Sequence, residues 1–137
     1  MPSFSEAFEK CPLVAILRGI EPEEIIEIGV ILTKAGFTLI EVPLNSPEPL
    51  ISIRKLSDTC GDRVVVGAGT VLNIDEVGDV AKAGGKMIVS PNTNIDVIIK
   101  TKSLNLISMP GFATTTEAFT AVKAGADALK LFPAEGS

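Results

Sequence analysis

Histidine, tryptophan and tyrosine are absent from this sequence of 137 residues, which has only two cysteines. Without histidine the chain lacks the commonest protein metal ligand and the usual base of Ser-His and Cys-His nucleophile pairs, so histidine-bearing zinc sites are excluded. Cys11 and Cys60 make no disulfide framework, and we expect both to be reduced, structural thiols. Any catalyst in this chain has to use lysine, arginine, carboxylates or backbone groups.

Long apolar runs and basic stripes are missing as well. The apolar runs are broken by glycine, proline or charge well short of the roughly 18 to 20 residues needed to cross a bilayer, so we expect no membrane span. The first residues are polar and show no signal-peptide pattern, which makes the cytoplasm the expected location. A net charge of −5 and the lack of Trp and Tyr for base stacking argue against nucleic-acid binding. Small-molecule chemistry or protein assembly remains.

Six short apolar runs recur along the chain, with helical periodicity between them. The runs are residues 13–19, 39–44, 64–69, 87–91, 106–111 and 128–133. Helix ends are marked by Lys-Ala-Gly at residues 34–36, 82–84 and 123–125, and helix starts by Asn73 with Glu76 and Thr114 with Glu117 in N-cap spacing. The sequence therefore predicts strands that alternate with helices.

Strands joined by crossover helices pair in parallel, in a doubly wound sheet or in a closed barrel. Proline or glycine ends each run, and no G-x-G-x-x-G turn follows the first one, so a dinucleotide-binding sheet is disfavoured. We predict an α/β fold of the (β/α)8 TIM-barrel type, as one domain over residues 1–137. A full barrel has eight strands and this chain supplies six, so we expect the last two βα units to be lacking and two parallel edges to be exposed.

Three charged side chains are predicted to point into the barrel. Strand side chains alternate between faces, and this parity places Arg18, Glu41 and Lys130 inward near the carboxyl ends of their strands, where barrel active sites are built. Two bland alternatives stay open, namely a structural ion pair of Arg18 with Glu41 and a lysine that snorkels from a strand end.

These residue types suit one kind of chemistry. A lysine in an apolar pocket loses part of the stabilisation of its ammonium form and becomes an amine nucleophile, which forms a Schiff base with a carbonyl carbon. Glu41 can move the protons, and Arg18 offers a donor fork that fits a carboxylate. The set predicts an imine-forming aldolase or a related lyase that acts on a keto acid without metal or organic cofactor.

Six motifs in order resemble the class I aldolases of 2-keto-3-deoxy-6-phosphosugar acids. They are VAILRGI, GFTLIEVPLNSP, VGAGTVL, IVSPN, PGFATTTEAFTA and GADALKLFPAE. The resemblance covers the chain from Cys11 onward. Within the family, Asn45 and Ser46 after the second strand make the chain more similar to the enzymes that act on 2-dehydro-3-deoxy-6-phosphogalactonate than to those for 6-phosphogluconate, where an Arg-Thr pair is common.

The resemblance implies roles for single residues. Lys130 would be the Schiff-base residue, Glu41 the general acid/base and Arg18 the carboxylate clamp. Residues of three other motifs match positions that line the pyruvyl pocket: Thr70, Pro91 and Phe132. As alternatives, these could be a turn residue, a strand stop and core packing in that order. Gly111 and Phe112 would shape the rim.

The family also implies a homotrimer, a phosphorylated keto sugar acid as substrate, and pyruvate and glyceraldehyde 3-phosphate as products. Phosphate binding would lie in the lacking units. Three alternatives stay open: a 2-dehydro-3-deoxy-6-phosphogluconate or 4-hydroxy-2-oxoglutarate aldolase, an inactive fragment that only self-associates, and an unrelated (β/α) phosphate-binding enzyme.

Overall fold

The computed structural model describes residues 1–136, and Ser137, the last residue of the predicted domain, lies outside them. Its strands are parallel and follow one another in chain order. They are β1 Val14–Ile16, β2 Leu39–Pro43, β3 Val65–Gly69, β4 Met87–Val89, β5 Ile107–Met109, β6 Gly111–Phe112 and β7 Lys130–Leu131. Strands β1 to β5 form one sheet and β6 pairs with β7. The parallel pairing was predicted from the alternation of strands and helices, whereas the separate β6–β7 pair was not.

Strands β5 and β6 are one predicted run that proline divides. Pro110 lies between them and has no N–H to donate to a ladder. The segment before β7 lies beside this run and is hydrogen-bonded to it. The amides of Asp127 and Ala128 donate to the Ser108 carbonyl, and the amide of Lys130 donates to the Pro110 carbonyl. Strand β7 thus continues the curved arrangement in sixth place.

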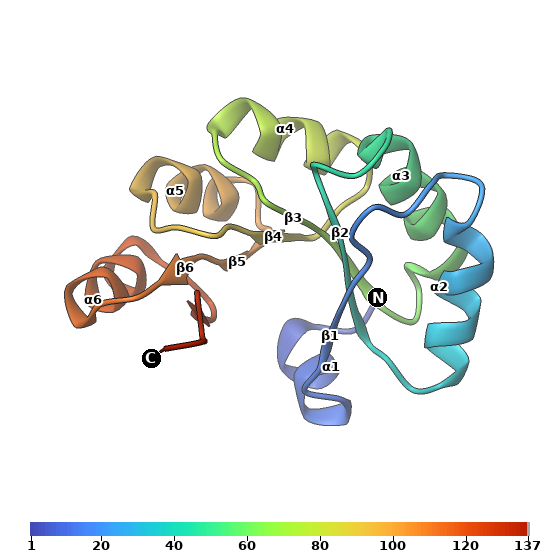
Figure 1. The fold of residues 1–137 in the computed structure, drawn as a ribbon, viewed down its shortest axis with the longest axis horizontal. Helices are drawn as coiled ribbons and strands as arrows, with labels where there is room; N and C mark the ends of the chain where they lie inside the picture. The colour runs from blue at the N-terminus through green and yellow to red at the C-terminus, as the bar shows by residue number, and fades with distance from the viewer. Residues whose placement is uncertain (137) are drawn as a thin grey trace.

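Helices cover the outer side of this sheet (Figure 1). They are α2 Ile25–Lys34, α3 Pro49–Cys60, α4 Ile74–Lys82, α5 Ile95–Ser103 and α6 Thr115–Ala124. The three predicted Lys-Ala-Gly ends are confirmed, because Gly36, Gly84 and Gly125 each follow a helix with positive φ. The predicted N-caps at Asn73 and Thr114 are confirmed too, by hydrogen bonds from the amides of Glu76 and Glu117.

A further helix, α1 Phe4–Lys10, was not predicted. It begins with a capping box of Ser3 and Glu6, whose Ser-x-x-Glu spacing is visible in the sequence. Ala7 is 1% exposed, and its carbonyl accepts a hydrogen bond of 2.6 Å from the Thr38 hydroxyl at the start of β2. This helix therefore closes the amino-terminal end of the sheet's inner face.

The strands bury side chains on both faces, as expected of a parallel sheet. Towards the helices, Ile40, Val42, Val66, Ala68 and Ile88 join one apolar cluster. On the inner face, a second cluster joins the strands to α1: Ala7, Leu39, Val65, Met87 and Val89. Strands β2 and β3 are buried along their whole length. This alternation settles which residues point inward.

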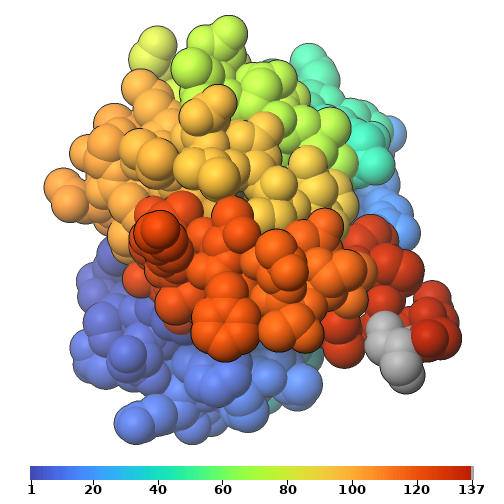
Figure 2. Space-filling model, turned by 90° about the vertical axis from the view of Figure 1, so that its left-hand side faces the viewer, coloured from blue at the N-terminus to red at the C-terminus, as the bar shows by residue number. Residues whose placement is uncertain are grey.

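Burial falls towards the two edges of the sheet. Within residues 1–136, β1 pairs only with β2 and β7 only with β6. Ile16 on β1 is 48% exposed and Leu131 on β7 is 45% exposed, whereas inner residues of β2 to β4 are fully buried. The last described residues stand away from the body at the side of the molecule (Figure 2). The curved sheet is open along one side.

The strands are shorter than the apolar runs suggested. The first run, 13–19, yields only Val14–Ile16, and the last, 128–133, only Lys130–Leu131. Both lie at an edge, where a strand has one neighbour and fewer ladder bonds hold it extended. No helix within residues 1–136 is long and apolar enough to cross a membrane.

Candidate active site

Glu41 lies at the centre of the predicted site. It sits on β2 between Ile40 and Val42, which point to the helices, so its own side chain points inward. The residue is 3% exposed, so its carboxylate is almost fully removed from water. Burying a carboxylate is costly unless positive charge or a ligand compensates for the lost water. The position therefore demands a partner.

Lys130 comes from the opposite edge of the sheet. It pairs in register with Gly111, which continues the inward parity of Ile107 and Met109, so the strand register agrees with the predicted inward orientation. The side chain is half-buried, and its Nζ lies 4.8 Å from the centre of the Phe132 ring. An ammonium at this distance over an aromatic face is attracted by the ring quadrupole.

Arg18 follows β1 and is exposed. Ile16 pairs in register with Glu41, and Arg18 has the same parity as Ile16, whereas Ala15 and Leu17 pack against the helix-side cluster. Arg18 therefore leaves β1 on the inner side. The three predicted charges come from strands one, two and six of the arrangement and face the same interior.

Both predicted cations act on the Glu41 carboxyl. Burial raises the pKa of the Glu41 carboxyl above its ordinary value of 4.5, and the positive charges of Lys130 and then Arg18 act in the opposite direction. No pair among the three comes within ion-pair distance in the described residues. A carboxyl whose pKa is raised by burial is better suited to give and to take up a proton than an ordinary surface carboxylate.

Gly69 provides the space that the Glu41 carboxylate occupies. A Cβ added to Gly69 would lie 2.8 Å from Cδ of Glu41 and would overlap its Oε2. Gly67, two residues earlier on the same inward face, is likewise crowded by Met87. Sequence reasoning missed this contact, although two glycines at alternate strand positions signal a close approach.

Thr70, the next residue, has a strained backbone with φ of 56°. A β-branched residue rarely adopts this conformation, which costs on the order of 1–3 kcal/mol and is found mainly at functional sites. Thr70 lies where β3 ends at the carboxyl side of the sheet. The strain supports a role beyond that of an ordinary turn.

Pro91 is close to the strand that carries Lys130's partner. A Cβ on Gly111 would overlap the carbonyl group of Pro91, and Thr93 donates a hydrogen bond of 2.6 Å to the Gly111 carbonyl. The loop after β4 is thereby packed against β6. Phe132 is 42% exposed and follows β7 at the open edge of the sheet. Phe112, predicted at the rim, is half-buried on β6.

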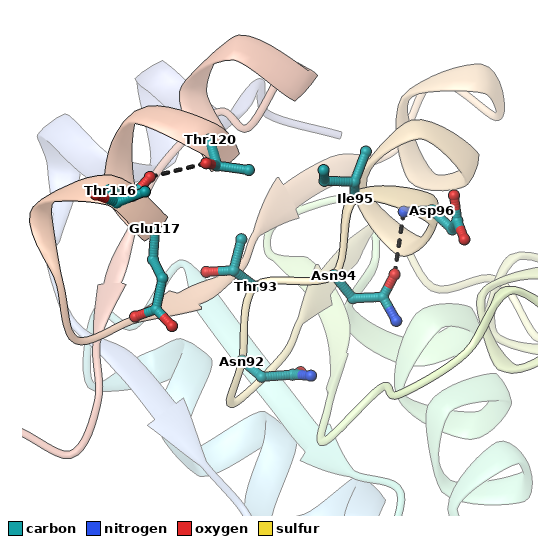
Figure 3. Close-up of a pocket in the computed structure, with 8 residues that line it drawn as sticks. All are labelled: Asn92, Thr93, Asn94, Ile95, Asp96, Thr116, Glu117 and Thr120. Carbon is teal, nitrogen blue, oxygen red and sulfur yellow. Dashed lines mark hydrogen bonds between the residues drawn. The ribbon is translucent and has the colours of Figure 1, made fainter.

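A separate hollow of about 550 Å³ lies between the starts of α5 and α6 (Figure 3). It is lined by Asn92, Thr93, Asn94, Ile95, Asp96, Thr116, Glu117 and Thr120, and so by none of the predicted site residues. Asn94 already caps α5, and Glu117 accepts hydrogen bonds from the amides of Ala113 and Thr114. The side-chain oxygens of Asn94 and Glu117 in this hollow thus already accept hydrogen bonds at the starts of the two helices. Within residues 1–136 there is no cluster of side chains that would hold a metal ion.

Comparisons with known proteins bear directly on this site. A family model described as "Aldolase: KDPG and KHG aldolase" matches residues 4–137. The 2-dehydro-3-deoxy-6-phosphogalactonate aldolase of Escherichia coli (strain K12) is 47% identical over 90% of this chain and 60% of its own length. A probable enzyme of the same name from Rhizobium meliloti (strain 1021) is 46% identical over 90% of this chain and 58% of its own. The chain thus spans about three fifths of the length of these relatives.

Solved structures agree. One described as "Native KDPGal structure" superposes with a TM-score of 0.90 at 46% identity, over 92% of this chain and 61% of that one. KDPG aldolase from Legionella pneumophila, with pyruvate captured as a covalent carbinolamine intermediate, gives 0.85 at 26% identity, over 94% and 62%. A cube-shaped cage made by fusing symmetric oligomeric domains gives 0.83 at 46% identity, over 88% and 44%.

These likenesses confirm the TIM-barrel type of fold and the family that the motifs predicted. The roles of the six site residues stay predictions, since none of the comparisons assigns them. With the family model matched from residue 4 to the end and relatives at 46–47% identity, the chain belongs to the KDPG and KHG aldolase family.

Proposed function

We propose that this chain carries the Schiff-base centre of an aldolase that cleaves 2-dehydro-3-deoxy-6-phosphogalactonate to pyruvate and glyceraldehyde 3-phosphate. The observation that carries the proposal is the strand register, which supports a common inward direction for Arg18, Glu41 and Lys130 around the buried carboxyl of Glu41. A structural ion pair would bring opposite charges into direct contact, whereas within residues 1–136 neither Arg18 nor Lys130 comes within ion-pair distance of Glu41. The covalent pyruvate intermediate of the Legionella relative supports the same chemistry.

The mechanism follows from the three groups. The Lys130 amine attacks C2 of the keto acid, while Arg18 binds its carboxylate. Glu41 gives a proton to the carbinolamine oxygen, which leaves as water, and an iminium forms. Glu41, now a carboxylate, takes the proton of the C4 hydroxyl, the C3–C4 bond breaks, and its electron pair passes into the iminium to give an enamine. The aldehyde departs. Protonation of the enamine at C3 and hydrolysis then release pyruvate and restore Lys130.

The galactonate substrate is favoured over its gluconate epimer by the relatives. The two at 46–47% identity bear the galactonate name, while a 2-dehydro-3-deoxy-phosphogluconate aldolase from Treponema pallidum is 28% identical. An activity on gluconate or on 4-hydroxy-2-oxoglutarate is the second candidate.

Pyruvate release tests the function. We expect pyruvate, measured by coupled reduction to lactate, to be released from the galactonate substrate faster than from the gluconate epimer. Lys130→Met is expected to abolish release. Lys123→Met, which removes an exposed lysine in the last turn of α6, is the matched control and is expected to retain it. Release by Lys130→Met at the wild-type rate would contradict the assignment of the nucleophile, and no release by the wild type would contradict the function.

We further propose that residues 1–137 form the first six units of an eight-unit barrel. The relatives' greater length and the two unpaired strand edges support this arrangement. Fusing the remaining part of the E. coli relative after Ser137 is then expected to bury Ile16 and Leu131, which are 48% and 45% exposed. Hydrogen exchange of the β1 and β7 amides would report this, and unchanged exchange would contradict it.

Self-association is proposed as well. A matched domain at 46% identity is part of a cage built from symmetric oligomeric domains, which supports a homo-oligomer, and we favour a trimer. Sedimentation equilibrium is expected to give three times the chain mass, and a monomer at micromolar concentration would contradict this.

Cys11 and Cys60 are free, in keeping with a reducing, cytoplasmic location.

A further inference from the structure

The turn that carries Arg18 has a defined geometry. The amide of Ile20 donates to the carbonyl of Leu17 at 3.3 Å, so residues 17–20 form a β-turn with Arg18 and Gly19 at its centre. Gly19 has φ of +78°, which matches the third residue of a type II turn. In this turn the peptide between Arg18 and Gly19 is flipped relative to a type I turn, so a hydrogen bond from the Gly19 amide helps to select the turn type and to hold the backbone on both sides of Arg18.

Two hydrogen bonds to the neighbouring strand and loop hold this turn. The amide of Leu17 donates to the carbonyl of Glu41 at 3.0 Å, and the amide of Gly19 donates to Oγ of Ser46 at 3.0 Å. They lie on either side of Arg18. The Arg18 side chain has no hydrogen bond or ion pair of its own within residues 1–136, so its direction depends on these backbone contacts.

Ser46 is itself firmly placed. It is 6% exposed, and its amide donates to the carbonyl of Pro43 at 3.0 Å. Pro43 ends β2 two residues after Glu41, on the same inward parity. Ser46 therefore ties the peptide after Arg18 to the strand that carries the acid/base.

We propose that Ser46 is a positioning residue for substrate binding: its hydroxyl fixes the Arg18–Gly19 peptide and so aims the Arg18 guanidinium at the carboxylate of the keto acid. This inference rests on the proposed function. Without the hydroxyl the Gly19 amide loses its acceptor, the turn is held only by the hydrogen bonds of the Leu17 and Ile20 amides, and Arg18 samples directions away from Glu41 more often. The keto acid is then held less tightly, while Lys130 and Glu41 keep their places.

The exchange of pyruvate methyl protons in D2O, followed by proton NMR, tests this assignment because it requires the imine and the enamine but no sugar phosphate. Ser46→Ala is expected to raise KM for pyruvate about fivefold, as for the loss of one neutral hydrogen bond, with kcat within twofold. Ser46→Thr keeps a hydroxyl and is expected to restore most of the affinity. Ser52→Ala is the matched control, since the Ser52 hydroxyl is also buried but has no hydrogen-bond partner in residues 1–136.

A second pair of measurements separates positioning from general stability. In an Arg18→Ala background, Ser46→Ala is expected to leave KM unchanged, because the group that it positions is gone. The Gly19 amide is expected to exchange with solvent at least tenfold faster in Ser46→Ala than in the wild type.

The outcomes are distinct. An unchanged KM, an equal fall in kcat, an additive effect in the Arg18→Ala background or an unchanged Gly19 exchange rate would each overturn the role of Ser46. A wild-type chain that exchanges no methyl protons would instead overturn the proposed function, and the role of Ser46 with it.

Discussion

Replacing Gly69 by alanine would place a methyl group where the Glu41 carboxylate now lies. The new Cβ would be 2.8 Å from Cδ of Glu41 and would overlap Oε2. Carbon atoms in contact prefer a separation of about 3.5–4.0 Å, so the carboxyl group has to move by about 1 Å. Strand β3 is paired on both sides, with β2 and β4, and cannot give way. The carboxyl of Glu41 moves instead.

The cost of this shift falls on catalysis. A misplacement of about 1 Å is known to lower rates about 100-fold, which equals a rise of about 2.7 kcal/mol in the activation barrier. We therefore expect Gly69→Ala to slow the exchange of pyruvate methyl protons about 100-fold. Lys130 lies on another strand, so borohydride trapping of pyruvate on it is expected to continue, at a lower rate.

A matched glycine in α4 provides the control. A Cβ at Gly78 would meet nothing within 4 Å, so Gly78→Ala is expected to keep the wild-type exchange rate and to stabilise its helix by about 0.5–1 kcal/mol. If Gly69→Ala were folded by circular dichroism and exchanged pyruvate protons within threefold of the wild type, the placement of Glu41 over Gly69 would be refuted.

Two further predictions concern stability. Because burial raises the pKa of Glu41 above 4.5, the folded state binds the Glu41 proton more tightly than the unfolded state does. The contribution of this proton to the free energy of unfolding is complete below pH 4.5 and is lost as the pH rises through the folded-state pKa. Glu41→Gln, which does not ionise, is thus expected to gain stability over the wild type in urea unfolding as the pH is raised from 4 to 7, and a constant difference would argue against this. Thr114→Ala removes the cap of α6 and is expected to cost about 1 kcal/mol of unfolding free energy. Thr116→Ala, at an exposed position inside the helix, is expected to cost nothing or to stabilise slightly because alanine has the higher helix propensity, and equal losses would contradict the cap.

Local features were predicted well from the sequence. The ends of α2, α4 and α6 follow from lysine and glycine within one turn, and the caps of α4 and α6 follow from residues three apart. The inward orientation of Glu41 follows from the two-residue period of a strand, because one face of β2 has to pack against helices. Such signals lie within a few residues and survive in any tertiary setting.

Contacts between distant residues were not predicted. The bond from Gly19 to Ser46 spans 27 residues, and the fit of Glu41 over Gly69 depends on the register of β2 with β3. Strand length was not predicted either, since the runs 13–19 and 128–133 yield only Val14–Ile16 and Lys130–Leu131. Helix α1 is a different case, because Ser3 and Glu6 have the Ser-x-x-Glu spacing of a capping box, which is a local signal for a helix start.

The central claim is that the Lys130 amine forms an imine with the keto group of pyruvate. Reduction with borohydride in the presence of pyruvate, followed by intact mass measurement and peptide mapping, tests it most directly. We predict one reduced pyruvate adduct per chain, located on Lys130 and absent from Lys130→Met. A folded chain without an adduct, or an adduct on another lysine, would contradict the claim.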